Sequence, residues 1–214
     1  MPDTAARVAA LGFAPVAAPL LVVHHGVVPP GIAADAVLVT SRNALPALRD
    51  YSDRPILAVG SATAARARDA GFAHVLDAEG DAADLAELSS RTLRAGARLL
   101  LAHGRGQGGA LMAELRRRGF RVRGRAAYAV TPVRALPPAA DAALRAQSVH
   151  AALFLSADTA RTFVRLLPAR SRQLLTEVDA LAIGASAAEA LSPLPWHRVR
   201  VSFRPTLDQV LALL

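Results

Sequence analysis

The sequence has no cysteine and no lysine among its 214 residues, and aromatic residues make up only 4% of it. The absence of cysteine excludes disulfide bridges and thiolate metal ligands. Because lysine is absent, all 25 basic residues are arginine, whose guanidinium group binds carboxylates through two parallel hydrogen bonds. The scarcity of aromatic residues favours a core of alanine, leucine and valine.

The sequence also lacks any apolar run of the roughly 18 residues that a membrane-spanning helix needs. Its most apolar region, residues 15–29, is interrupted by Pro19 and by His24 and His25. The N-terminal Met-Pro-Asp-Thr has no basic segment leading into an apolar core, as a signal peptide would. We therefore expect a cytoplasmic protein without a membrane partner.

The composition is that of a globular chain, with 53% hydrophobic and 20% charged residues. A length of 214 residues suits one large domain or two of roughly 100 residues each. The net charge of +8 favours anionic partners, either a metabolite with several acid groups or a nucleic acid.

One stretch has the pattern of a strand, a tight turn and a helix. The short apolar run at residues 56–59 is typical of a strand buried on both faces. Gly60 and Ser61 interrupt this run, and Ser61 or Thr63 can cap the helix expected at residues 64–70. Such a turn leaves backbone N–H groups free to receive an anion.

This unit recurs near the end of the chain, where Gly184 takes the place of Gly60 and Ser186 supplies a hydroxyl. The units before the two turns also match, with Ser41 corresponding to Ser156, and the units after them match more loosely. Three consecutive strand–helix units in the same order predict two similar α/β domains.

Apolar runs and helical composition alternate along most of the chain. They predict strands near residues 16–23, 36–40, 56–59, 73–76, 97–102, 121–130, 151–155, 179–183 and 198–202. Helices are expected near residues 5–11, 43–50, 63–70, 82–95, 109–118 and 207–214. Such regular alternation predicts parallel sheets with helices on both faces.

Two stretches rich in proline and glycine, residues 25–32 and 130–138, are linkers by composition. They bracket the middle of the chain. We therefore expect a second domain at residues 30–130, inserted by a two-segment linker into a first, discontinuous domain of residues 1–28 plus 131–214.

Several motifs in order along the chain resemble the uroporphyrinogen-III synthase family. They are the turn of Gly60, Thr63 and Ala64, the run Leu-Leu-Leu-Ala-His-Gly-Arg-Gly at residues 99–106, the Tyr-x-x-Thr-Pro at residues 128–132, the strand end at residues 154–156, and the Pro-Thr-Leu at residues 205–207. The resemblance covers about residues 2–214. It implies two flavodoxin-like parallel-sheet domains joined by a two-stranded ladder.

The sequence departs from the family at two places. Members begin with a strand ending in Thr-Arg, and this strand is absent, so the first domain is expected to lack its first strand. That strand would lie centrally, between the strands at residues 16–23 and 151–155. In the second Gly-x-x-Thr-Ala turn, Ala187 holds the threonine position and Ser186 supplies a hydroxyl one residue earlier.

The resemblance implies a reaction on hydroxymethylbilane, a linear tetrapyrrole with eight carboxylates. The enzyme expels the terminal hydroxyl as water, inverts the last pyrrole ring through a spiro intermediate and closes the macrocycle to uroporphyrinogen III. No cofactor or metal is expected, and the six histidines show no spacing typical of metal ligands. We expect a monomer.

Candidate substrate-binding residues lie where strands end, because ligands of open α/β sheets bind beyond the carboxyl ends of the strands. Two rims of helix N-termini would present many N–H donors to the carboxylates of the substrate. The candidates are Ser41, Arg42, Gly60, Ser61, Thr63, His103, Gly104, Arg105, Ser156, Gly184 and Ser186.

Tyr128 corresponds to the family tyrosine that is the usual candidate to protonate the departing hydroxyl. A phenol has a pKa of about 10, so at neutral pH it retains a proton that it can donate as a general acid. The alternative is a packing role for Tyr128 at a hinge between domains.

Parts of the sequence fit three other functions. Gly104-x-Gly-x-x-Gly109 fits the dinucleotide-binding fingerprint, but residues 121–128 contain no acid to bind a ribose. The arginines between Arg116 and Arg125 could contact nucleic acid, although they form no recognisable nucleic-acid motif, and we expect no nucleic-acid partner. A synthase-like binding protein without catalytic activity is the third.

Overall fold

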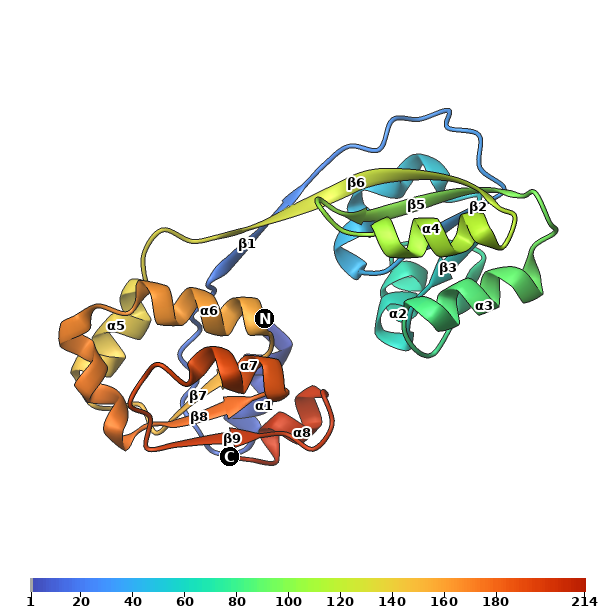
Figure 1. Cartoon of the computed structure of the whole chain (residues 1–214). Helices are drawn as coiled ribbons and strands as arrows, with labels where there is room; N and C mark the ends of the chain where they lie inside the picture. The colour runs from blue at the N-terminus through green and yellow to red at the C-terminus, as the bar shows by residue number, and fades with distance from the viewer. Residues whose placement is uncertain (1) are drawn as a thin grey trace. The chain divides into compact units, whose positions relative to one another are not determined.

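The structure is a computed structural model that describes residues 2–214. The chain forms two compact units (Figure 1). One unit consists of the chain up to Val22 together with Pro132–Leu214, and the other consists of Val23–Thr131. Each unit contains a sheet of parallel strands with helices packed against it. The expected α/β class is therefore confirmed.

The unit Val23–Thr131 is built on a six-stranded sheet in the order β1-β6-β5-β2-β3-β4. Its strands are β1 (Leu21–His25), β2 (Ala36–Val39), β3 (Ile56–Ala58), β4 (Val75–Asp77), β5 (Arg98–Gly104) and β6 (Arg121–Pro132). Strands β2 to β6 pair in parallel. The sheet is doubly wound, because the chain runs outward from β2 through β3 to β4 and then returns to the other side of β2 with β5 and β6. The strand beside β2 on that side is therefore the fourth of the five parallel strands, whereas in flavodoxin it is the third. The short β4 lies at one edge of the sheet.

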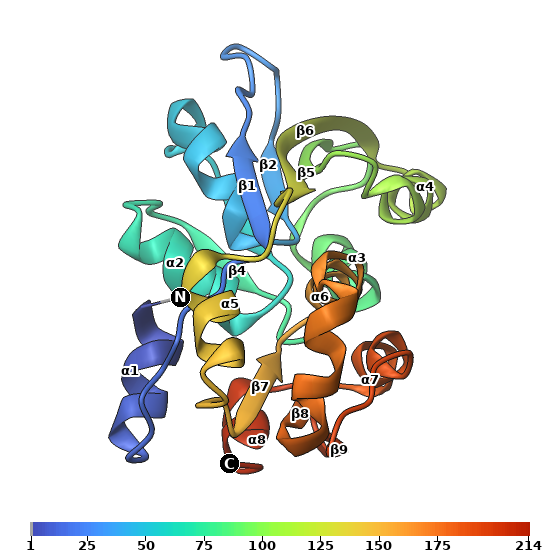
Figure 2. The same ribbon diagram turned by 90° about the vertical axis from the view of Figure 1, so that its left-hand side faces the viewer.

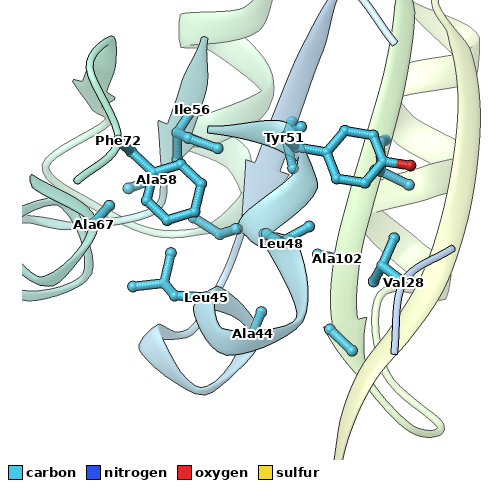
Figure 3. Close-up of a cluster of buried hydrophobic side chains, with 14 of the residues drawn as sticks. Val28, Ala44, Leu45, Leu48, Tyr51, Ile56, Ala58, Ala67, Phe72 and Ala102 are labelled. Carbon is cyan, nitrogen blue, oxygen red and sulfur yellow. The ribbon is translucent and has the colours of Figure 1, made fainter. Parts of the chain in front are cut away.

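Helices cover both faces of this sheet. They are η1 (Arg42–Tyr51), α2 (Ser61–Asp69), α3 (Ala82–Thr92) and α4 (Gly109–Arg117). Figure 3 shows one core, in which Leu45, Leu48 and Phe72 pack against Ile56 and Ala58. On the other face, buried leucines of α3 and α4 pack against Leu38, Leu57, Leu99 and Leu101.

The helix expected at residues 43–50 forms as the 3₁₀ helix η1. Pro46 lies inside it and lacks the N–H group that an α-helix would need there, and Leu48 departs from helical geometry. The Tyr51 hydroxyl at its end donates to the carbonyl of Pro29 at 2.5 Å and accepts from the N–H of Ile32 at 3.1 Å. These two bonds attach the preceding loop to the sheet core.

The other unit has a three-stranded parallel sheet in the order β7-β8-β9. Its elements are α1 (Pro2–Ala10), α5 (Pro138–Arg145), β7 (Ala151–Phe154), α6 (Ala157–Leu166), η2 (Ala169–Glu177), β8 (Asp179–Ala182), α7 (Ala185–Leu191), β9 (Arg198–Val201) and α8 (Leu207–Leu211). Helices α6 and α7 lie on one side of this sheet, and α1 and α8 lie on the other (Figures 1 and 2).

Three aromatic rings fill the core under α6. Phe154, Phe163 and Trp196 lie with ring centroids 5.3 to 5.7 Å apart, and the indole N–H of Trp196 donates to the carbonyl of Leu191. Edge-to-face and stacked pairs of this kind stabilise a core beyond the area that they bury. They compensate for the small size of the sheet.

The strand expected at residues 16–23 of the first domain is wrong in position. Residues 13–20 have no regular structure, and Leu21–His25 forms β1, which pairs with β6 of the six-stranded sheet. The Gly26 N–H donates to the Ala127 carbonyl at 2.8 Å, and the Val133 N–H donates to the Leu20 carbonyl at 3.0 Å, as in an antiparallel pair. The long β6 offers this segment a backbone partner.

Asp35 and Arg98 join the starts of β2 and β5. The carboxylate of Asp35 accepts from the Arg98 guanidinium at 2.7 Å and from the Arg98 backbone N–H at 2.8 Å. These hydrogen bonds, with the charge of Arg98, hold the pKa of Asp35 far below its usual range. The pair lies at the amino ends of the strands and therefore serves the fold.

We predict that Asp35→Asn lowers the unfolding temperature at pH 7 and that the difference from the wild type shrinks below about pH 4. The pKa of Asp35 is lower in the folded state than in the unfolded state, so its stabilisation is present above the unfolded pKa of about 3.9 and fades as the pH falls toward the folded value. Thermal unfolding between pH 2 and pH 7 measures this. Asp53→Asn, at an exposed pair with Arg54, is the control. A difference that does not change with pH would refute the prediction.

Candidate functional site at the strand ends

The carboxyl ends of the parallel strands lie in register in the unit Val23–Thr131. Val39 at the end of β2 lies opposite Ala58 of β3 and Ala102 of β5. Further along, Gly104 lies opposite Tyr128 of β6. The loops that follow these strands therefore meet at one edge of the sheet. The direction of winding reverses between β2 and β5, which is the place where open α/β sheets bind ligands.

The helices that start at this edge differ in their caps. The hydroxyl of Ser41 accepts from the N–H of Asn43 at 3.2 Å and caps η1, and Asp81 caps α3 through the N–H groups of its first turn. Helices α2 and α4 begin after Gly60 and Gly108, and neither has a side-chain cap. The first-turn N–H groups of α2 and α4 are therefore available to an anion.

The sequence-predicted side chains take different positions at this edge. Arg42, Ser61 and Arg105 are exposed. Thr63 is buried, with 9% of its surface exposed. His103 is half-buried, and its Nδ1 lies 2.8 Å from the carbonyl oxygen of Gly104.

Tyr128 is buried, and its surroundings fix the ring. A Cβ atom added to Gly104 would lie only 3.0 Å from the Tyr128 Cζ atom, so the ring packs directly over the glycine backbone. The N–H of Arg105 donates to the carbonyl of Tyr128 at 2.8 Å. The hydroxyl of Tyr128 donates to the side-chain oxygen of the exposed Gln107 at 3.3 Å. The phenol is thus held inside while its hydroxyl points toward a surface residue.

Gln107 is the residue that sequence reasoning missed. It lies in the Gly-Arg-Gly-Gln-Gly-Gly turn, and its N–H donates to the carbonyl of Gly104 at 2.9 Å. Its sequence position gives one indication of a role: it is the only amide side chain in a glycine-rich turn that also contains the predicted binding residues Gly104 and Arg105. Its contact with Tyr128 depends on pairing between β5 and β6, which local sequence does not reveal.

The unit with β7, β8 and β9 has an edge of the same kind. Phe154 lies opposite Ala182, so Ser156 and Gly184 follow neighbouring strands. The hydroxyl of Ser156 caps α6 by accepting from the N–H of Thr159 at 3.1 Å, whereas α7 begins after Gly184 without a side-chain cap. Ser186 is exposed on the first turn of α7.

Ala187 is fully buried, in the position that matches Thr63. Both positions therefore face the cores of their units. The difference between threonine and alanine in the two turns therefore lies at a buried position.

The arginines between residues 116 and 125 are partly neutralised within the fold. Arg117 pairs with Glu114, and Arg118 pairs with Glu114 at 2.6 Å and with Glu87 at 2.7 Å. The Arg116 guanidinium donates to the carbonyl of Val122 at 3.0 Å, and that of Arg125 donates to the carbonyl of Gly124 at 2.9 Å. These contacts occupy much of the cluster that a nucleic acid would need.

Comparison with known proteins bears on this site. The profile of the family described as uroporphyrinogen-III synthase HemD matches residues 2–212. The chain belongs to the uroporphyrinogen-III synthase family. No curated protein matches the chain. Family membership supports a function in tetrapyrrole biosynthesis, as an enzyme that acts on a small molecule.

A solved structure of this family shares the fold. The uroporphyrinogen-III synthetase of Helicobacter pylori is 18% identical, with a TM-score of 0.64, over 91% of this chain and 89% of that one. A mutant uroporphyrinogen III synthase of Thermus thermophilus is 22% identical, with a TM-score of 0.49, over 99% and 92% of the two chains.

Across residues 2–214, no helix has the length and apolar character needed to cross a membrane.

We predict that Gly104→Ala destabilises the protein by about 1–3 kcal/mol, the usual effect of an overpacked position. The new Cβ would lie 2.6 Å from the Gln107 side-chain oxygen and 3.0 Å from the Tyr128 ring, so it would displace both. Urea unfolding measures the change. Gly109→Ala is the matched control, because a Cβ there meets no atom within 4 Å. Equal stability of the two variants would contradict the close packing of Tyr128.

Proposed function

We propose that the protein converts hydroxymethylbilane to uroporphyrinogen III, as a cytoplasmic, monomeric lyase that needs no metal or cofactor. The observation that carries the proposal is the pair of uncapped helix N-termini, of α2 after β3 and of α4 after β5, which flank the winding reversal between β2 and β5. Tyr128 lies on β6, the next strand beyond β5. This arrangement suits a substrate with many carboxylates and one hydroxyl to be expelled. Family membership supports the same reaction.

The carboxylates of the substrate would bind chiefly to backbone N–H groups. The first turns of α2 and α4 supply these donors, and the exposed Arg42 and Arg105 supply guanidinium groups at the same edge. In the other unit, the uncapped start of α7 and the hydroxyls of Ser156 and Ser186 would bind further carboxylates. A net charge of +8 attracts the polyanion before it reaches these groups.

Tyr128 is the proposed general acid. Its phenolic proton would pass to the terminal hydroxyl of the substrate, so that the carbon–oxygen bond breaks and water departs. The remaining methylene cation would be attacked by the carbon of the last pyrrole ring that already bears its methylene bridge, which forms the spiro intermediate. The bond from that carbon to the old bridge would then break, and the bridge would bond to the other free carbon of the same ring, so that the ring is inverted as the macrocycle closes. The proton that the final ring carbon loses balances the one that Tyr128 gave. The Tyr128 hydroxyl donates its one proton to Gln107 in this structure, so the hydroxyl of the substrate would have to replace the Gln107 oxygen as the acceptor.

The decisive assay supplies hydroxymethylbilane and separates the product isomers. We expect the type III isomer in place of the type I isomer, which forms spontaneously without inversion of the last ring. Chromatography of the oxidised porphyrins measures the ratio. If the protein gives only type I, it is a binding relative without catalytic activity.

We predict that Tyr128→Phe lowers turnover by about 10²-fold while substrate binding is largely kept, because general acid catalysis contributes roughly 10²- to 10⁴-fold. Phenylalanine preserves the ring that packs over Gly104 and removes only the proton donor. Steady-state kinetics give kcat and KM separately. His24→Ala, which removes a surface contact with Thr131, is the control. Unchanged turnover in Tyr128→Phe would leave Tyr128 a packing residue.

A further inference from the structure

Phe203 is an exposed aromatic residue at the carboxyl edge of the β7-β8-β9 sheet. Val201 at the end of β9 lies opposite Ala182 of β8, so Phe203, two residues further, follows β9 as Gly184 follows β8. The side chain of Phe203 is 90% exposed. Among the described residues, no other large hydrophobic side chain is as exposed as Phe203, and the chain has only 4% aromatic residues.

The loop that carries Phe203 is anchored on both sides. The Ser202 N–H donates to the carbonyl of Ala182 at 2.9 Å, and its hydroxyl lies 3.0 Å from the carbonyl oxygen of Ile183 and 2.8 Å from that of Arg204. The N–H of Thr206 also donates to the Arg204 carbonyl at 2.8 Å. The loop is therefore fixed beside the Gly184 turn, and the exposure of Phe203 is built into the fold.

The neighbours of Phe203 combine apolar and cationic character. Arg204 is exposed, and no acidic side chain within residues 2–214 forms an ion pair with it. Leu155, at the end of β7, is 37% exposed on the same edge. Between them lies the Gly184 turn, which follows the central strand β8. A flat apolar ring that bears carboxylates would find an apolar contact and a cation at this edge.

We infer that Phe203 and Arg204 form a pyrrole-binding element of this unit. The Phe203 ring stacks on one pyrrole ring of the substrate, and the Arg204 guanidinium binds a carboxylate of that ring. This inference rests on the proposed function, since it assigns a part of the same substrate. Backbone N–H groups recognise only the acid groups, so Phe203 supplies the contact with the ring itself.

The test compares Phe203→Ala, Phe203→Leu and Phe203→Tyr in the full-length protein with hydroxymethylbilane. We expect Phe203→Ala and Phe203→Leu to raise KM about tenfold, the size of effect seen when a stacked aromatic is removed. Phe203→Tyr keeps KM within about twofold, and kcat changes little in all three. Val201→Ala, two residues earlier and 45% exposed, is the matched control.

Arg204→Ala is expected to raise KM about threefold at low salt, and this effect disappears at about 0.5 M salt because exposed ion pairs are screened. The control is Arg172→Ala, an exposed arginine of η2 without an assigned role. A loss that persists at high salt, or an equal loss in Arg172→Ala, would overturn the role of Arg204.

The outcomes separate the inference from the proposed function. Suppose first that the wild type forms the type III isomer, so that the proposed function stands. Stacking on Phe203 is then refuted if either Phe203→Ala or Phe203→Leu has the KM of the wild type. If the wild type forms no type III isomer, the proposed function fails, and titration with uroporphyrin III decides the inference. Weaker binding by Phe203→Ala than by Val201→Ala then supports it, and equal binding refutes it.

Discussion

The parallel pairing of β2 with β3 on one side and β5 on the other is the constraint on which the larger unit depends. All four residues of β2 are fully buried, so its backbone groups must be satisfied within the sheet. From β2 the chain adds β3 and β4 on one side, and it then adds β5 and β6 on the other side. As a result, η1 and α2 pack on one face of the sheet, and α3 and α4 pack on the opposite face. The loops after β2 and β5 consequently diverge, and the edge between them is left open for a ligand.

The caps at this edge keep acidic side chains away from the winding reversal. Helix α3 follows the outermost strand β4 and begins with Asp81 and Asp84, whose carboxylates occupy its own N–H groups. Helices α2 and α4 lie nearer the centre and begin with glycine. Acid caps close to the winding reversal would repel carboxylates and take up the donors. The acidic residues that cap a helix at this edge, Asp81 and Asp84, therefore lie beside the outermost strand β4 and away from the winding reversal.

Local sequence predicted those parts whose pattern is local. The apolar runs of β2, β3, β5 and β8 marked buried strands, and glycine and hydroxyl residues marked the turns at Gly60 and Gly184. Sequence could not place β1, since Leu21–His25 has a strand pattern in either sheet and only β6 decides its partner. It could not separate the buried Thr63 from the exposed Ser61, or join Gln107 to Tyr128, because these depend on helix orientation and on strand register.

The smaller unit shows how little sheet is needed to present such turns. Its three strands leave β7 and β9 as edges, and β9 carries Arg198 and Arg200, charged residues that discourage pairing with another chain. Asp179 joins the strand starts: its carboxylate binds Arg198 at 3.0 Å and His197 at 2.9 Å, and these partners lower its pKa. Polar bonds hold the amino ends of β8 and β9, and the aromatic core packs against the middle of the unit. At the carboxyl ends, the Ser202 N–H donates to the carbonyl of Ala182. The strands can end in small, open turns that leave backbone donors free.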